Sequence, residues 1–328
     1  MWQMNSYFIK NPDKKPKSSY MAKAITKLNE QIDTEVKGQY GQNVIIKSGR
    51  VTINNSELDC EFSTNFDDNT QSDEAEITIY NLTETTINGF VNKARITITA
   101  GYGKDTGVIF KGYITSKKTY WSGVDKITTI RAIDDMNRSE SRVISKSYAA
   151  GTKASYILRD LVRSLGLPIA VIKYERDYTY TDEVTVDGSL PDAIKQYADV
   201  CGVSAYVCKS MVYVRPLNDG DNTRFKLSSD TGLLSVSEFE ETVSSEEFGE
   251  ETVKGFEVEM LLQHRLQTAS IIELDSINYK GTFRVREGSH TYSGTEFKTK
   301  AKIIACKPPA AGKAATLVRN LTNMNNKS

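Results

Sequence analysis

Residues 74–80 have the sequence Glu-Ala-Glu-Ile-Thr-Ile-Tyr, and residues 95–100 have the sequence Arg-Ile-Thr-Ile-Thr-Ala. In both stretches isoleucine or alanine alternates with threonine, tyrosine or charged residues, which is the period-two pattern of a half-buried strand. The pattern recurs in residues 108–118 and 126–133, and glycine-bearing segments separate the strands as hairpins require. We therefore predict an antiparallel β module over roughly residues 42–135, built as a sandwich or small barrel.

The middle of the chain changes to a helical period. Apolar residues recur at helical spacing from residue 154 to 165 and again from 190 to 201. Two short apolar stretches, residues 203–208 and 211–215, then flank the dipeptide Lys209-Ser210, which is typical of a two-residue hairpin. We predict a compact α+β insert made of two helices and a hairpin.

The period-two pattern returns after residue 224 and predicts a second β domain. The fold class is therefore α+β and mainly β, with two antiparallel β-barrel or sandwich domains separated by the two-helix and hairpin insert. The predicted parts are an N-terminal arm at residues 1–41, a first β domain at 42–140, the insert at 141–222, a second β domain at 223–307 and a C-terminal tail at 308–328.

The charge of the chain is balanced, with 42 Lys and Arg residues against 42 Asp and Glu residues. This balance argues against a broad basic surface for nucleic acid or for an anionic membrane. No apolar run approaches the ~20 residues that span a bilayer. The N-terminal residues are not typical of a secretory signal, so we expect synthesis and folding in a cytoplasm.

The sequence holds no pattern that specifies catalysis or a metal site. The four cysteines form no CxxC pair, and we predict that they are buried and reduced. The two histidines, His264 and His290, lie near no nucleophile motif. Glycines 101, 103 and 107 fall between two strands and predict a hairpin, not a phosphate loop. We expect no enzymatic activity, no cofactor and no bound metal.

Residues 237–251 hold seven glutamates and no basic residue. They predict either a solvated mobile loop, or an acidic surface that binds a basic partner or lines a pore and repels DNA phosphate. Aromatic residues around the predicted hairpins favour core packing or a protein interface over a nucleic-acid platform. The candidate interface residues are Tyr102, Tyr113, Tyr120, Trp121, Glu240, Glu241, Glu246 and Glu247.

The order of these features resembles the baseplate hub proteins of contractile-tailed phages and of related phage-tail-like, bacteriocin-like particles of Gram-positive bacteria. The resemblance rests on residues 76–82, 96–102, 108–115 and 255–262 together with the two-helix insert. It covers about residues 42–305, and the acidic run within that range has no counterpart that we can match.

The resemblance implies two tube-like β domains that imitate tail-tube subunits. Three copies of such a chain would present six quasi-equivalent positions and form a homotrimeric ring between a hexameric tail tube and the central spike. The implied partners are the chain itself, the tail tube protein, the central spike protein, baseplate wedge proteins and the tape measure protein. DNA would pass only as cargo through a lumen. The implied location is the tail baseplate of a virion or phage-tail-like particle, assembled in the bacterial host cytoplasm without a membrane anchor.

Two alternatives remain at this point. One is a baseplate component that binds or degrades the cell wall. The other is a tail-tube or tail-completion protein, which shares the β module but usually lacks the helical insert.

Overall fold

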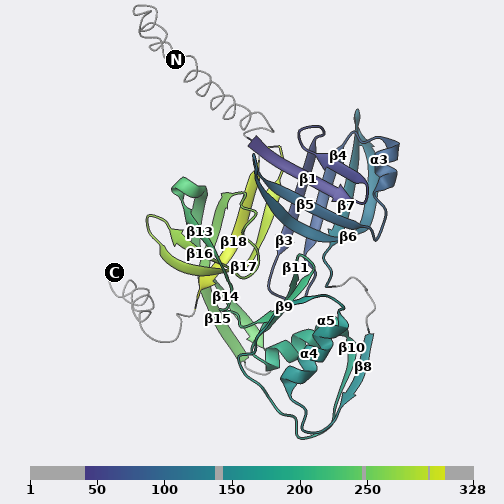
Figure 1. The fold of residues 1–328 in the computed structure, drawn as a ribbon. Helices are drawn as coiled ribbons and strands as arrows, with labels where there is room; N and C mark the ends of the chain where they lie inside the picture. Colours follow the sequence, from purple (N-terminus) through teal and green to yellow (C-terminus); the bar gives the residue numbers. More distant parts are fainter. Residues whose placement is uncertain (1–40, 137–142, 246–248, 295, 307–328) are drawn as a thin grey trace, which may run out of the picture.

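The computed structural model describes residues 41–136, 143–245, 249–294 and 296–306 (Figure 1). The first part of the chain contains β1 (Gln42–Ser48), β2 (Val51–Asn54), β3 (Cys60–Phe66), β4 (Glu74–Tyr80), α3 (Glu84–Gly89), β5 (Arg95–Tyr102), β6 (Asp105–Ser122) and β7 (Asp125–Ile133). The middle part contains β8 (Val143–Tyr148), α4 (Ala154–Ser164), β9 (Ile169–Ile172), β10 (Val184–Ser189), α5 (Leu190–Val200), β11 (Ser204–Cys208) and β12 (Met211–Arg215). The last part contains β13 (Asp221–Ser228), the 3-10 helix η3 (Ser229–Thr231), β14 (Leu233–Ser245), β15 (Gly249–Leu261), β16 (Ser270–Asp275), β17 (Lys280–Tyr292) and β18 (Phe297–Ala305).

The predicted fold class is confirmed, since the described chain is mainly β with two principal helices between two β regions. Each β region has its own apolar core, because the period-two pattern turns alternate side chains inward. Ile77, Ile98 and Ile130 are fully buried in the first region, and Val258 and Leu274 in the second.

The two β regions share one sheet. Thirteen strands of the described chain are connected by hydrogen bonds, in the order β14-β15-β18-β17-β3-β4-β7-β6-β5-β1-β2, with β16 and β13 branching from β17. The joint between the regions is the antiparallel pair β3 and β17, which runs from Phe66 opposite Gly288 to Phe62 opposite Tyr292. The two predicted β domains are therefore joined edge to edge.

Strand β17 is the branch point of the sheet. Its first half pairs with β16, and its second half pairs with β3. A register shift between Val285 and Glu287 separates the halves, and such a bulge bends a strand enough to serve two neighbours. Strand β13 pairs with β16 in parallel, which differs from the purely antiparallel arrangement predicted. The β14–β15 hairpin lies between these two strands in sequence and gives the chain the length to return in the same direction.

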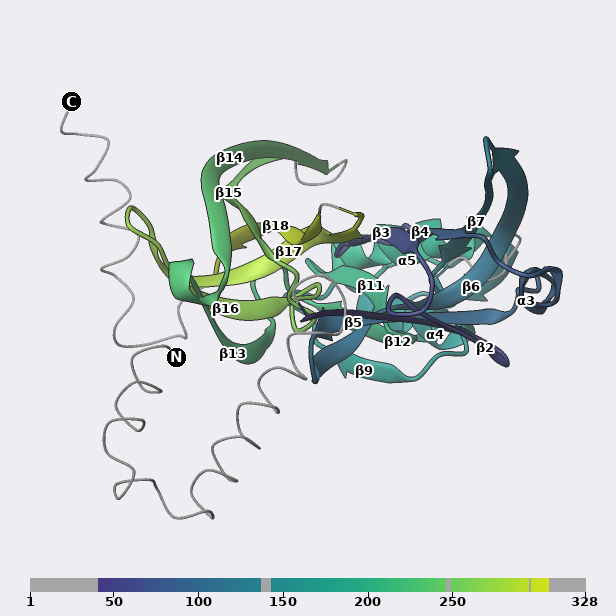
Figure 2. The same ribbon diagram turned by 90° about the horizontal axis from the view of Figure 1, so that it is seen from above.

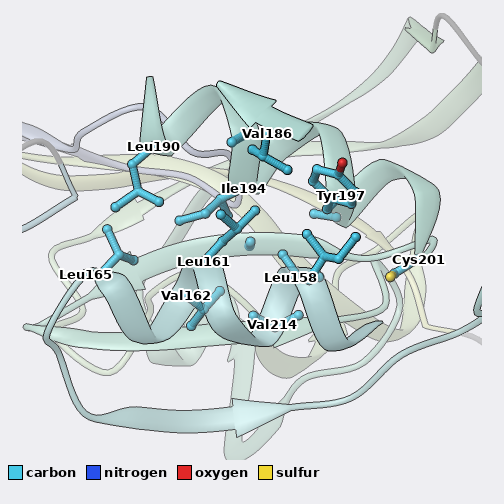
Figure 3. Packing of buried hydrophobic residues seen from close by; sticks show 14 of the residues in the cluster. Leu158, Leu161, Val162, Leu165, Val186, Leu190, Ile194, Tyr197, Cys201 and Val214 are labelled. Atoms are coloured by element: carbon cyan, nitrogen blue, oxygen red, sulfur yellow. The ribbon is translucent and has the colours of Figure 1, made fainter. Parts of the chain in front are cut away.

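The insert folds around its own apolar cluster. Figure 3 shows side chains of α4 and α5, among them Leu158, Leu161 and Ile194, gathered in this cluster. The predicted hairpin is confirmed as β11 and β12. Lys209 and Ser210 both have positive φ, at 50° and 68°, as a type I′ turn requires. Strands β8, β9 and β10 were not predicted, and β9 lies parallel to β12.

A substitution at Gly288 tests the joint between β3 and β17. A Cβ atom at this position would meet the backbone carbonyl of Lys300 and the ring of Phe66. Because backbone cannot give way cheaply, we expect Gly288→Ala to lower the free energy of unfolding by about 1–3 kcal/mol. Gly294→Ala is the matched control, since a Cβ atom there meets nothing within 4 Å. Thermal unfolding followed by circular dichroism measures both, and equal midpoints for the two variants would contradict the close packing.

Candidate interaction surfaces

A wide polar face covers one side of the shared sheet. Along β14-β15-β18-β17-β3-β4-β7-β6, one side packs on the apolar cores and the other side carries charged and hydroxyl side chains. Two hollows on this face have volumes of about 350 and 480 Å³. Their lining includes Asp67, Glu257, Glu287, Lys300 and Lys302 in the first, and Ser63, Asn65, Glu74, Glu76 and Arg131 in the second. Ligand pockets are mostly apolar, so the hollows do not fit a buried small-molecule site.

Two long hairpins extend from the ends of this face. In Figure 2 the β14–β15 hairpin rises at the left and the β6–β7 hairpin at the right, with β17, β3 and β4 between them. The tip of the β6–β7 hairpin carries exposed apolar side chains, of which Trp121 is 68% and Val124 is 89% exposed. Exposed apolar groups at the tip of a projecting hairpin are typical of a protein contact.

The four aromatic residues that were predicted to form an interface lie in different surroundings. Tyr120 and Trp121 lie together in the exposed part of β6, next to the hairpin tip. Tyr113 is buried, with the Arg95 guanidinium 4.4 Å from its ring centroid, so it serves packing within the chain. Tyr102 is half-buried against Phe297, and its hydroxyl donates a hydrogen bond to the Phe297 carbonyl at 3.3 Å. Tyr102 thus links the two β regions internally.

The acidic run was predicted as a loop or an acidic surface, and the loop prediction is wrong for its described residues. They belong to the β14–β15 hairpin, because the backbone of β14 pairs along its length with β15. Glu240 forms an ion pair with Lys254 at 3.2 Å, directly opposite on β15. Glu241 lies 3.3 Å from Nη1 of Arg286 and 3.7 Å from Nζ of Lys302. Glu246 and Glu247 lie outside the described residues.

A buried arginine joins the three parts of the chain. Arg284 on β17 is fully buried, and its Nη1 donates to Oδ2 of Asp68 at 2.7 Å. Its Nε donates to the backbone carbonyl of Asp219 at 2.9 Å. Asp68 follows β3, and Asp219 lies between the insert and β13. Charge-assisted hydrogen bonds of this kind fix orientation, because a misplaced partner would leave a charge buried alone.

Two further arginines bridge the parts at the rim of this junction. Arg265 donates to the Asp105 carboxylate from Nη1 at 2.8 Å and from Nη2 at 2.7 Å, and so ties the second β region to the start of β6. Arg95 on β5 donates from Nη1 to Asp135 and to the Ser210 hydroxyl, both at 3.0 Å. The turn of the β11–β12 hairpin is thereby held against the first β region.

Buried carboxyl groups surround the same junction. The pKa of Asp134 rises to about 7, mainly because burial penalises its charged form, while the amide of Met136 donates to its Oδ1 at 2.9 Å. The pKa of Asp67 rises to about 6, again chiefly through burial. Burial and the nearby charge of Asp134 raise the pKa of Asp73 well above its usual value. Burial therefore disfavours the charged form of each of these three carboxyl groups.

No pattern in the sequence predicts these bridging residues. Arg284 and Arg286 alternate with apolar residues in β17, which is the usual pattern of a solvent-facing side of a strand. Arg284 is fully buried and Arg286 half-buried, because another part of the chain covers that side. Such coverage depends on contacts between residues that are distant in sequence, such as Asp68 and Arg284.

The cysteines and histidines of the described chain serve packing. Cys60, Cys201 and Cys208 are buried free thiols, as predicted, whereas Cys306 is half-buried. Burial raises the pKa of each of the three buried thiols to about 12. His290 is fully buried, and burial lowers its pKa to about 3. Among the described residues no group of three His, Cys, Asp or Glu side chains could hold a metal ion. Within the same residues no helix is long and apolar enough to cross a membrane.

Comparison with protein families gives one match. The model of the family described as "baseplate hub gp41" matches residues 42–280. This range includes the first β region, the insert and the start of the second β region. A search of curated protein sequences gives no match.

Several solved structures share the fold at low sequence identity. A tail protein from Neisseria meningitidis MC58 is 9% identical with a TM-score of 0.59, over 81% of this chain and 97% of that one. The 43 kDa tail protein of prophage MuSo2 from Shewanella oneidensis is 7% identical with a TM-score of 0.57, over 80% and 97%. An E. coli type VI secretion component, described as structurally similar to phage T4 tail proteins gp27 and gp5, is 10% identical with a TM-score of 0.54, over 79% and 76%.

Replacement of the junction arginine should destabilise the whole chain. Arg284→Leu leaves the buried Asp68 carboxylate with only the longer contact to Nε of Arg286 at 3.7 Å, so we expect the free energy of unfolding to fall by about 3 kcal/mol. The matched control is Arg131→Leu, which removes an exposed ion pair with Glu76 on the same sheet and should cost at most about 1 kcal/mol. Urea unfolding measures both, and equal losses would show that the buried pair does not hold the parts together.

The buried carboxyl group of Asp134 should make stability depend on pH. Its folded pKa of about 7 lies above its ordinary value of 3.8, so its stabilising contribution is complete below pH 4 and is lost as pH rises through 7. Asp134→Asn keeps the oxygen that accepts from Met136 and cannot ionise. Relative to this variant, the parent should lose roughly 1 kcal/mol of stability for each pH unit between 5 and 7. Melting curves of both proteins measure the difference, and a constant offset across this range would refute the assignment.

Proposed function

The chain belongs to the baseplate hub gp41 family, and from this premise we propose that three copies of it close into a ring that joins a hexameric tail tube to the central spike. The observation that carries this proposal is that one strand arrangement occurs twice in the chain. A chain that offers two similar modules can meet a six-fold partner with only three copies.

The two β regions repeat the same connectivity. The first region orders its strands β3-β4-β7-β6 with β5 beside the first half of β6, and the second orders them β14-β15-β18-β17 with β16 beside the first half of β17. The strands therefore correspond in chain order, as β3 with β14, β4 with β15, β5 with β16, β6 with β17 and β7 with β18.

The correspondence extends to single residues. In β6 a register shift follows Ile114, which lies opposite Ala132, and in β17 the same shift follows Val285, which lies opposite Ile303. All four of these side chains are buried. Four residues before Ala132 and Ile303 lie Thr128 and Thr299, both fully buried and both hydrogen-bonded to the residue opposite. Agreement in register at this level supports a structural duplication.

Among the described residues, β14, β2, β13 and the second half of β6 each have an unpaired edge in this sheet, and two of these edges lie at the ends of the run β14-β15-β18-β17-β3-β4-β7-β6. In the described part of the chain, β14 pairs only with β15, and residues 115–122 of β6 pair only with β7. Unpaired strand edges favour association with another chain. Open edges at opposite ends of one curved sheet support head-to-tail contacts, which close into a ring when the rotation permits.

The polar face of the sheet suits the wall of an aqueous channel. Acidic and basic side chains alternate across neighbouring strands, as in Glu257 on β15, Lys302 on β18 and Glu287 on β17, which lie opposite one another. In the proposed ring this face lines the lumen, and DNA passes along it only as cargo. A surface of mixed charge holds no strong net attraction for phosphate.

The proposal includes the remaining parts of the assembly. Residues 42–140 and 223–307 are the two tube-like domains, and residues 141–222 are an insert on the outside of the ring. The tail tube protein binds one end and the central spike protein the other, with wedge proteins around the ring and the tape measure protein within reach. The hub is assembled in the host cytoplasm into the baseplate of a phage or phage-tail-like particle and catalyses no reaction.

The two alternative functions have weaker support. A cell-wall hydrolase needs opposed carboxylates with an apolar wall or an activated nucleophile, whereas the carboxylates of Asp67, Glu257 and Glu287 in the first hollow lie among the ammonium groups of Lys300 and Lys302. A tail-tube protein needs only one β module per subunit, whereas this chain holds two and the insert. No particular observation favours either alternative.

Measurement of mass tests the ring. We expect sedimentation and native mass spectrometry at micromolar concentration to give three times 36.6 kDa, or about 110 kDa. Negative-stain images should show three-fold rings with a central channel, and these rings should bind purified tail tube protein. A chain that stays monomeric with and without tube protein, or one that binds peptidoglycan instead, would exclude the proposed hub ring.

A further inference from the structure

The internal joint between β3 and β17 predicts how neighbouring copies pair in the ring. This inference rests on the proposed function and adds to it the register of the contact. Within one chain, β3 is the edge strand of the first module and pairs with β17 of the second. Between chains, the corresponding strands are β14 of one copy and β6 of the next.

The internal joint supplies the register. Across it, the residue numbers of opposed pairs run from Phe66 and Gly288 to Phe62 and Tyr292. Because the two modules are equivalent, each residue of the internal joint has a counterpart on one of the open edges, and the two sides of the joint are matched one at a time. On one side, Gly288 corresponds to Lys117 and Tyr292 to Trp121, because Glu287 and Ser116 both follow the register shift.

The other side follows from β4 and β15. Glu76 lies opposite Arg131 on β7, and Glu257 lies opposite Lys302 on β18, so Glu76 and Glu257 correspond. Their partners on the outer strands are Ser63 and Ser237. Counting from these serines, Phe66 corresponds to Glu240 and Phe62 to Val236.

We propose that β14 of one copy pairs antiparallel with residues 115–122 of β6 in the next copy, in the register of the internal joint. The opposed pairs are then Lys117 and Glu240, Lys118 and Phe239, Tyr120 and Ser237, and Trp121 and Val236. A second copy of this chain is thus the occupant of both open edges.

The chemistry of the opposed residues fits this register. Lys117 and Glu240 have opposite charge, and a cross-strand pair of this kind is favourable; within one chain the Lys117 ammonium donates to the Ile87 carbonyl at 2.6 Å and Glu240 pairs with Lys254 at 3.2 Å. Trp121 meets Val236 where the internal joint sets Tyr292 against Phe62, with ring centroids 5.9 Å apart. The exposed side chains of Trp121 and Tyr120 are covered in the ring.

The facing of the side chains agrees with this register. Arg131 lines a hollow on the polar face and lies opposite Ser116, so Tyr120, four residues later, faces the same side. Glu257 lines the other hollow and lies opposite Ser237. Tyr120 and Ser237 therefore both face the polar side, as two residues opposed in one sheet must. A slip by one residue would put them on opposite faces.

Disulfide trapping tests the register. In a Cys306→Ser background, whose other cysteines are buried, we combine Tyr120→Cys with Ser237→Cys. Directly opposed residues lie within disulfide reach, whereas positions two residues away lie at about 7–8 Å and are out of reach. The matched controls are Tyr120→Cys with Ser235→Cys and with Phe239→Cys, each offset by two residues on the same face of β14.

We expect mild oxidation to convert the Ser237 pair into covalent dimers and closed trimers, at least ten-fold faster than either control. If the parent protein sediments as a trimer but a control pair cross-links fastest, the proposed register is wrong and the proposed ring still stands. A trimer in which no pair cross-links overturns the pairing of these two edges. A disulfide that forms within one chain, so that the oxidised protein stays monomeric, also counts against the contact between copies. A parent without any trimer overturns the proposed ring itself.

Discussion

The hydrogen-bonded joint between β3 and β17 is the constraint on which the rest of the architecture depends. A strand edge that is left open is a site of uncontrolled association, and this joint closes one edge of each β region against the other. Because the joint continues the hydrogen-bond ladder, the two regions share one sheet and one polar face. Their relative orientation is therefore set by backbone pairing, which is stiffer than contact between side chains alone.

The buried arginine of β17 extends this constraint to the insert. Strand β17 bends so that its first half pairs with β16 and its second half with β3, and Arg284 lies next to the bend. There it binds Asp68 from the first region and the carbonyl of Asp219 beside the insert. A buried ion pair contributes little net stability, but it penalises every arrangement in which one partner is misplaced. The junction thus selects one placement of the three parts.

The sequence predicted what depends on local pattern. Alternation in residues 74–80 and helical spacing in residues 154–165 each identified an element, because side-chain periodicity reflects burial directly. Pairing between distant strands could not be predicted, since β3 and β17 carry no mark of one another. Glu240 and its neighbours suggested a loop, because charge dominates the run, yet pairing with β15 makes it a strand. Of the predicted interface residues, Tyr113 proved buried for the same non-local reason.

The joint within one chain and the proposed joint between copies form at different times, which explains why the two modules differ in sequence while they agree in register. The internal joint forms as the chain folds, so it can be apolar, and Phe62 and Phe66 are buried there. The corresponding edge of β14 carries Val236, which is half-buried against the second core, and Glu238 and Glu240, which are exposed to water before assembly. The opposite edge on β6 carries Lys117 and Lys118. Like charges oppose pairing of an edge with a copy of itself, whereas unlike charges permit pairing with the other edge. In the proposed ring, this division favours head-to-tail closure over symmetric dimers.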